Sequence, residues 1–179
     1  MNFRIMIKIT GILMVFFSSS FLGVYSNFKR KNRIRELKNF INAFEILKSE
    51  MNFSLNLLSD ISKKIYKKNK KNNNTEKFFY YFSENLDTKE FNSANEAWID
   101  ALSRIKNKSY LDEEDFDAIN NFSNALKTFD KDLKIKTLEL INFNLNNKIV
   151  YLEKDFLCQK KLFNQLGVLF GLLIIIIFL

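Results

Sequence analysis

The chain of 179 residues contains no histidine, no proline, one cysteine and four glycines. Without histidine or a cysteine pair it cannot assemble a Ser-His-Asp triad or the common zinc clusters, and its central part has no glycine-rich phosphate loop. We therefore predict that the protein is not an enzyme and has no catalytic residue, cofactor, metal ion or small-molecule substrate. The single cysteine, Cys158, also excludes a disulfide framework.

The absence of proline and the placement of glycine together indicate an all-α fold. All four glycines lie in two apolar segments near the ends of the chain: Gly11, Gly23, Gly167 and Gly171. The remaining residues must turn with Asn, Ser and Asp, a composition that favours helices joined by short polar loops. The central part is long enough for one modest core rather than two domains.

Charged residues are also absent from residues 9–28 and 162–179. As helices, these stretches reach roughly 30 Å and 27 Å, which is close to the hydrocarbon thickness of a bilayer. We predict a transmembrane helix with a short leader over residues 1–28 and a second transmembrane helix over residues 162–179. A helical domain, an antiparallel bundle, fills residues 29–161 between them.

Basic residues flank both predicted spans on the side of the central domain: Lys29, Arg30, Lys31, Arg33, Arg35, Lys160 and Lys161. The positive-inside rule then places this domain in the cytoplasm of a two-span protein of the cell membrane, with the lipid bilayer as a partner. A signal peptide is the competing interpretation of the first span, because Arg4 and Lys8 form a positive leader. The dense basic cluster after the span resists translocation and favours a retained helix.

The excess of basic over acidic residues also raises the question of nucleic-acid binding. The best candidate segment, residues 63–74, has one aromatic residue and no recognisable binding motif, so we predict no nucleic-acid partner. Attraction to anionic lipid headgroups is the more natural use of this charge. Gly167 and Gly171, four residues apart, indicate either close helix packing in the membrane or only the general frequency of glycine in membrane helices.

Apolar residues recur at helical spacing through the central domain. From Leu37 to Ile65 they predict one long amphipathic helix with a heptad-like seam. A shorter helix follows, begun by Asn74 or Thr75. A third begins at a capping box formed by Ser93 and Glu96.

The acidic run from Asp112 to Asp115 has two interpretations. It could form a metal or acid/base site, but no histidine is present to complete most such sites. We favour Asp112 as the cap of a helix whose positive end the neighbouring carboxylates stabilise. That helix is expected to bury Phe116, Ile119, Phe122, Leu126 and Phe129. A last pattern begins at Leu138 and has no breaker before the second span, which predicts one helix of more than 40 residues.

Four stretches of the chain resemble the stage III sporulation protein AB family. They are "RKNRIRELKNFINAFEILKSEMNFSLNLLSDISKKI", "FFYYFSENLDTKEFNSANEAWIDAL", "LKTFDKDLKIKTLELINFNL" and "KLFNQLGVLFGLLIIIIFL". The chain departs from the family pattern at Ser54, where a proline is usual, at Lys127, where a glycine is usual, and near Lys134, where a glutamine is usual. These departures affect the expected turn geometry more than the resemblance.

The resemblance implies a non-enzymatic platform subunit of a channel complex between mother cell and forespore, required for endospore formation. It further implies a cytoplasmic domain on the mother-cell side, similar to that of type II secretion platform proteins. The implied partners are other subunits of the channel complex and a cytoplasmic secretion-type ATPase. The alternative is a membrane-tethered signalling or regulatory protein that dimerises as a coiled coil through the seam from Leu37 to Ile65. Burial of that seam within one chain favours the bundle.

Overall fold

The structure is a computed structural model that describes residues 2–53, 57–68, 73–88 and 91–178, with side chains described within residues 28–158. All regular elements in these ranges are helices, in agreement with the predicted all-α fold. In chain order they are α1 (Asn2–Phe53), α2 (Leu58–Lys68), α3 (Asn74–Thr88), α4 (Ala94–Lys106), α5 (Glu113–Asn120), α6 (Phe122–Ala125) and α7 (Lys131–Phe178).

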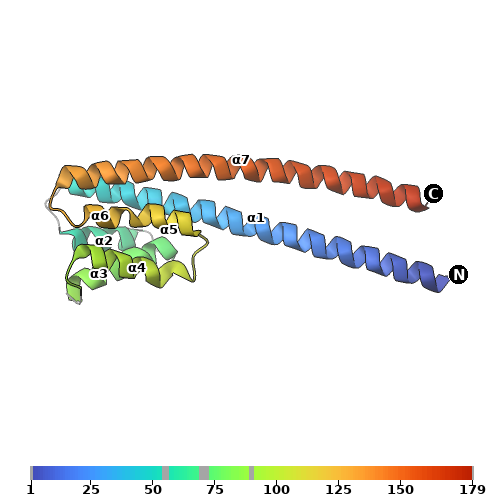
Figure 1. Cartoon of the computed structure of the whole chain (residues 1–179), viewed down its shortest axis with the longest axis horizontal. Helices are drawn as coiled ribbons and strands as arrows, with labels where there is room; N and C mark the ends of the chain where they lie inside the picture. The colour runs from blue at the N-terminus through green and yellow to red at the C-terminus, as the bar shows by residue number, and fades with distance from the viewer. Residues whose placement is uncertain (1, 54–56, 69–72, 89–90, 179) are drawn as a thin grey trace.

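Two long helices, α1 and α7, run antiparallel along the whole molecule (Figure 1). The short helices α2 to α6 gather around one end of this pair and form a bundle with it. Beyond the bundle, α1 and α7 both extend to the other end of the molecule, where the two chain termini lie. The single helix predicted from Leu138 into the C-terminal segment is confirmed by α7, which has 48 residues.

The prediction of one continuous helix from Leu37 to Ile65 was wrong, because α1 ends at Phe53 and α2 begins at Leu58. Ser54, the first of the predicted departures in turn geometry, lies outside the described residues. The apolar period continues across the break because α1 and α2 each turn an apolar face to the same core. Periodicity alone does not reveal such a break.

The seam itself is buried within the chain. Leu37, Phe44, Leu47, Ile61 and Ile65 are inaccessible to solvent, and partly buried residues of α1 and α2 pack beside them. This is the arrangement expected of a bundle, since a dimerising seam would be exposed in the single chain.

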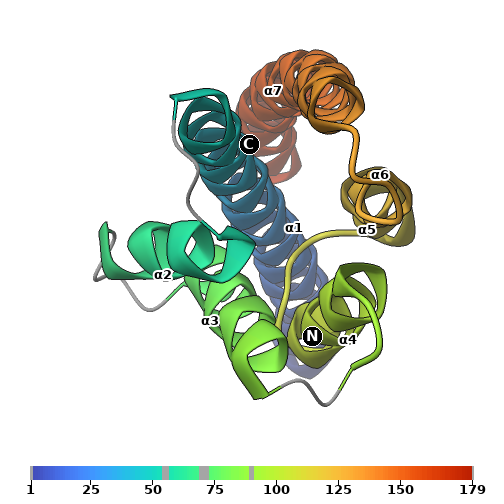
Figure 2. The same ribbon diagram turned by 90° about the vertical axis from the view of Figure 1, so that its left-hand side faces the viewer.

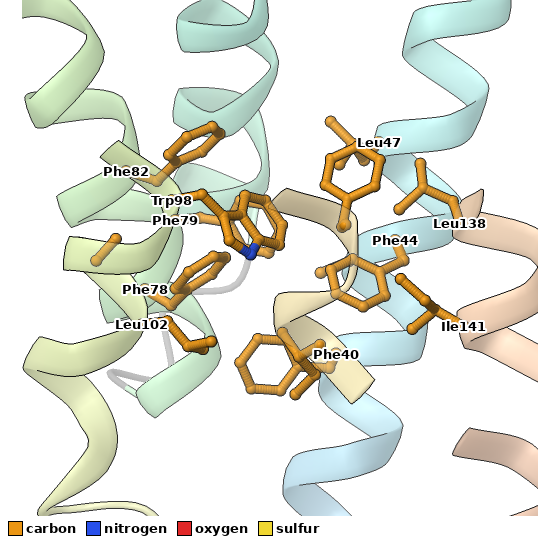
Figure 3. Packing of buried hydrophobic residues seen from close by; sticks show 14 of the residues in the cluster. Phe40, Phe44, Leu47, Phe78, Phe79, Phe82, Trp98, Leu102, Leu138 and Ile141 are labelled. Carbon is orange, nitrogen blue, oxygen red and sulfur yellow. The ribbon is translucent and has the colours of Figure 1, made fainter. Parts of the chain in front are cut away.

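An aromatic cluster centred on Trp98 of α4 fills the core (Figure 3). The ring centroid of Trp98 lies 4.6 Å from that of Phe78 and 5.0 Å from those of Phe82 and Phe122, with edge-to-face geometry. Phe44 stacks on Trp98 from α1, at 6.1 Å. We call Trp98 and its aromatic neighbours Phe44, Phe78, Phe79, Phe82 and Phe122 the aromatic core. It joins α1, α3, α4 and α6 through contacts worth up to about 1 kcal/mol per pair beyond simple burial.

The prediction that Phe129 lies on the buried face of one helix with Phe116 was wrong. That face is divided between α5 and α6, and the helical run stops at Ala125. Phe116, Ile119, Phe122 and Leu126 are buried, whereas Phe129 lies in the connection to α7 and is fully exposed.

No helix in the described part of the chain is both long and apolar enough to cross a membrane. The predicted spans, residues 9–28 and 162–179, lie outside the residues whose side chains are described, apart from Phe28. The two spans therefore stay predictions.

Candidate functional site

The most constrained polar arrangement lies where α1 and α7 leave the bundle. There Arg33 of α1 and Lys148 of α7 meet three carboxylates at the start of α5, from Asp112, Glu114 and Asp115. We call these five residues the ionic junction. It brings together residues more than 100 positions apart in the sequence, so it fixes how both long helices sit against the bundle.

Asp115 is the centre of the ionic junction, and its side chain is completely buried. Its Oδ2 atom accepts hydrogen bonds from Arg33 Nε at 2.7 Å and from the backbone N–H of Asp112 at 3.1 Å. Its Oδ1 atom accepts from Arg33 Nη2 at 3.1 Å and lies 2.8 Å from Lys148 Nζ. The carboxylate is thus bound in bidentate fashion by arginine and has a partner for each remaining acceptor site.

The local sequence explains why Asp115 is held so firmly. Asp112 accepts a hydrogen bond from the backbone N–H of Asp115 at 3.0 Å, while Asp115 accepts one from that of Asp112, which is a complete capping box. Asp112 therefore caps α5 and also pairs with Arg33. Lys148 Nζ reaches Glu114 at 3.0 Å and Asp112 at 3.4 Å. The first turn of α5 is thus clamped between the two long helices.

The pKa values of the junction show which effect dominates. Burial alone would raise the pKa of Asp115, but the hydrogen bonds from Arg33, Lys148 and the Asp112 backbone outweigh it and lower the pKa below its usual range. Burial would lower the pKa values of Arg33 and Lys148, yet their hydrogen bonds to Asp115 raise both. All three groups are therefore charged at neutral pH.

A second buried carboxylate fastens the connection between α4 and α5 to α1. Glu36 accepts hydrogen bonds from the Ser109 hydroxyl at 2.8 Å and from the backbone N–H of Tyr110 at 3.0 Å. The ring of Tyr110 meets that of Phe28 edge-to-face, with centroids 6.2 Å apart. These contacts hold the loop that leads into the ionic junction.

Polar contacts between α1 and α7 extend on both sides of the ionic junction. Towards the termini, Arg30 pairs with Asp155. Lys38, five residues after Arg33 on α1, lies 2.7 Å from Glu153 through its Nζ atom. Deeper in the bundle, Asn142 donates a hydrogen bond to Glu45 at 2.7 Å. The two long helices are thus held in one register over several turns.

The predicted topology-determining residues divide into two groups. Lys29, Lys31 and Arg35 are exposed and form no ion pair within the described residues, whereas Arg30 and Arg33 bind carboxylates of α7 and α5. The remaining members of the flank, Lys160 and Lys161, lie outside the residues with described side chains. The same holds for Gly167 and Gly171.

The predicted caps also take definite places. Ser93 caps α4 by accepting the backbone N–H of Glu96 at 3.3 Å, and the Glu96 carboxylate accepts from the backbone of Asn92 rather than of Ser93. At the start of α3 the capping side chain is Asn73, one residue before the expected Asn74 or Thr75. Both caps stabilise the first turns of their helices.

Sequence reasoning treated Asp115 only as part of an acidic run at a helix start and did not name Lys148, although a signal for Lys148 was present. Lys148 lies among Leu145, Ile149 and Leu152 on the buried face of α7, and a cation in such a position needs an anionic partner. Arg33, four residues before Leu37, occupies the same kind of position on α1. Among the side chains that the structure describes, no three His, Cys, Asp or Glu residues are arranged to hold a metal ion.

Comparison with known proteins identifies the family. The sequence profile described as "Stage III sporulation protein AB" matches residues 8–179. No curated protein sequence matches the chain. A solved structure titled "Stage III sporulation protein AB (SpoIIIAB)" is similar in fold, with a TM-score of 0.65 and 21% identity over 70% of this chain and 97% of that one. Since the profile covers nearly the whole sequence, the chain belongs to the stage III sporulation protein AB family, and its role is in sporulation.

Proposed function

We propose that the protein is a non-enzymatic membrane platform subunit of the channel complex between mother cell and forespore, and that it docks a secretion-type ATPase. The observation that carries the proposal is the ionic junction, which clamps the two long helices at the point where they leave the bundle together. Family membership supplies the sporulation context.

The ionic junction is suited to a protein that transmits force from a docked partner to the membrane segments. If residues 9–28 and 162–179 span the membrane, the bundle is held at both of its exits and cannot rotate freely about either helix. Because the ion pairs of Arg33, Lys148 and Asp115 resist sliding of α1 past α7, a displacement of the bundle reaches both spans. A shape change in a docked partner would therefore be passed to the membrane segments as one movement.

The end of the bundle farthest from the termini is the surface that a cytoplasmic partner reaches first. Phe53 is the last residue of α1, Leu57 precedes α2 and Phe129 precedes α7, and all three are largely exposed. The Lys131 side chain donates a hydrogen bond to the backbone of Asn52 at 3.0 Å, so the ends of α1 and α7 lie together. We propose these three apolar residues, named the distal tip, as the docking surface for the ATPase, since solvent-exposed apolar clusters mark interaction sites.

Deletion of the chain in its endospore-forming host tests the sporulation role. We expect the count of heat-resistant spores to fall by several orders of magnitude and to recover with the wild-type chain supplied in the mother cell. Normal numbers of heat-resistant spores from the deletion strain would overturn the platform proposal.

The distal tip has its own test. The two variants Phe53→Ser and Phe129→Ser are made in the full chain and studied in membranes. Each should reduce co-purification of the secretion-type ATPase whose gene lies beside that of this chain, because each removes exposed apolar contact area without affecting the core. The matched control is Tyr66→Ser, a half-exposed aromatic residue on α2. Equal recovery of the ATPase with all three variants would contradict docking at the tip and leave the deletion test untouched.

Orientation is tested by a reporter inserted between Lys127 and Thr128. Alkaline phosphatase at this site should be inactive and green fluorescent protein fluorescent, as expected for a cytoplasmic bundle. The reverse pattern would place the bundle outside and revive the signal-peptide interpretation. The alternative function, a signalling coiled coil formed by the seam from Leu37 to Ile65, is disfavoured because that seam is occupied by the chain's own core.

A further inference from the structure

Helix α7 has a second apolar face that the bundle does not use. Its inward face contributes Leu138, Ile141, Leu145, Ile149 and Leu152 to the core. Six large apolar residues on its other side are between 47% and 69% exposed: Leu133, Leu140, Phe143, Val150, Tyr151 and Leu157. A surface helix of a bundle needs one apolar face, so the second one requires a separate explanation.

Five of the six exposed apolar residues, all but Tyr151, follow a heptad. Leu133, Leu140, Asn147 and Lys154 are spaced by seven, and so are Lys136, Phe143, Val150 and Leu157, three positions later. These two rows correspond to the a and d positions of a coiled coil, and we call them the outer seam. The residues of the inward face fall at other heptad positions, so pairing through the outer seam leaves the core intact.

The outer seam is free within the described part of the chain. Helix α7 packs against α1, α5 and α6, and it lies at the edge of the bundle when the molecule is viewed along the long helices (Figure 2). The outer seam holds five of the six exposed apolar side chains. If each loses about 100 Å² of exposed surface, two copies together bury about 1,000 Å², which is the area that a biological interface should clear. The stripe is thus large enough to bind a second identical stripe.

We propose that two copies of the chain associate through their outer seams as a parallel two-stranded coiled coil. The pattern is self-complementary, because the two rows of one copy meet the same rows of the other about a twofold axis. Asn147 in the middle of the a row matches the polar a-position residue that specifies register and oligomer state in coiled coils. Lys154 at an a position lies beside the position of Glu153 in the second copy, whose carboxylate also pairs with Lys38 of its own chain.

The parallel orientation rests on the membrane attachment in the proposed function. If both copies enter the same bilayer through α7, their helices must point in the same direction. A parallel pair keeps the two seams in register from Leu133 to Leu157. An antiparallel pair would instead direct the two C-terminal segments away from each other.

Cysteine cross-linking of the full chain in membranes tests the proposal. In a Cys158→Ser background, Phe143→Cys and Val150→Cys are introduced separately, and the membranes are oxidised with copper phenanthroline. Each variant should give at least about tenfold more disulfide-linked dimer than Ser103→Cys, an exposed control on α4, because pairing raises the effective thiol concentration. Both variants must cross-link, since the two positions are roughly 10 Å apart along the helix and only a parallel pair places each opposite itself.

Three results would overturn the proposal. Dimer at the level of the Ser103→Cys control for both variants would exclude pairing at the seam, and dimer from only one variant would indicate an antiparallel or accidental contact. A second substitution provides an independent check. Leu140→Glu in the Val150→Cys chain should reduce the amount of disulfide-linked dimer to the control level, because it places the carboxylates of the two copies opposite each other. An unchanged yield would also overturn the proposal, whereas loss of spore formation alone bears only on the proposed function.

Discussion

The aromatic core and the ionic junction hold the same bundle together by opposite means. In the aromatic core, Trp98 and its neighbours contribute apolar area and ring contacts whose geometry can vary with little loss. In the ionic junction, every acceptor of the Asp115 carboxylate has a specific donor. The aromatic core stabilises the fold through apolar burial, and the junction selects the relative placement of α1, α5 and α7.

The two regions differ because burying an apolar side chain and burying a carboxylate have different energetic requirements. Removing apolar side chains from water is favourable without any partner of defined direction, at roughly 25 cal/mol per Å². Burying a carboxylate is unfavourable unless its hydrogen bonds are complete, so Asp115 tolerates only one arrangement of Arg33 and Lys148. Ion pairs at the point where α1 and α7 leave the bundle therefore fix the position of these helices better than additional buried apolar area would.

Truncation of the aromatic core should have the largest effect on stability. Trp98→Ala is expected to lower the free energy of unfolding by about 4 kcal/mol, because it leaves a large cavity among four helices. Urea unfolding of the full chain in detergent, followed by circular dichroism, measures the change. Trp98→Phe is the control and should cost much less, since the buried Trp98 Nε1 atom has no hydrogen-bond partner in the described structure. Equal losses for the two variants would contradict a core held by apolar burial.

Loss of the central carboxylate should come next. Asp115→Ala is expected to cost about 3 kcal/mol, because it leaves Arg33 and Lys148 partly buried without their main partner. The fluorescence of Trp98, the sole tryptophan, reports the unfolding of the bundle in urea. Glu114→Ala is the control, since this residue is mostly exposed and contacts Lys148 only at its edge. A loss no larger than that of Glu114→Ala would mean that the junction is dispensable for stability.

Acid should weaken the junction more than the aromatic core. The pKa of Asp115 is lowered in the folded state, so its contribution is complete above its unfolded pKa of about 4 and is lost as the pH falls through the folded value. The pKa of Lys148 is raised, so its contribution is complete below about 10.4 and is lost only in strong base. Between pH 6 and pH 3 the urea midpoint of the wild type should fall further than that of Asp115→Asn. Parallel curves would assign the acid sensitivity to other groups.

The sequence predicted the aromatic core better than the ionic junction. Apolar residues at helical spacing, such as Leu37, Phe44 and Trp98, are buried because solvent exclusion depends on the period of one helix and needs no knowledge of the others. The junction depends on three helices meeting, and the local pattern identified only one part of it, Asp112 as a cap. The sequence gives no direct sign that Asp115 faces Arg33, 82 residues away.

Breaks between helices were also beyond the local pattern. The period from Leu37 to Ile65 is shared by α1, which ends at Phe53, and α2, which begins at Leu58, since both helices face one core. Phe129 fits the spacing of Phe122 but follows the end of α6, where the chain leaves the core to enter α7. In each case periodicity missed the point at which a helix ends, and at Phe129 it therefore also predicted burial for an exposed residue.

The smallest effect should come from a surface ion pair of about the same length as one in the junction. Lys63 Nζ lies 2.7 Å from Asp87 on the surface, and Lys148 Nζ lies 2.8 Å from Asp115 in the junction. Lys63→Ala should leave the urea midpoint unchanged, because water and salt replace its partner at little cost, whereas Lys148→Ala should lower the midpoint measurably. Raising the salt concentration should reduce the difference between the urea midpoints of Lys63→Ala and Lys148→Ala only slightly, since salt screens the buried pair poorly. Equal midpoints for the two variants would show that burial adds nothing to the pair, and the contrast between core and junction would then rest on apolar area alone.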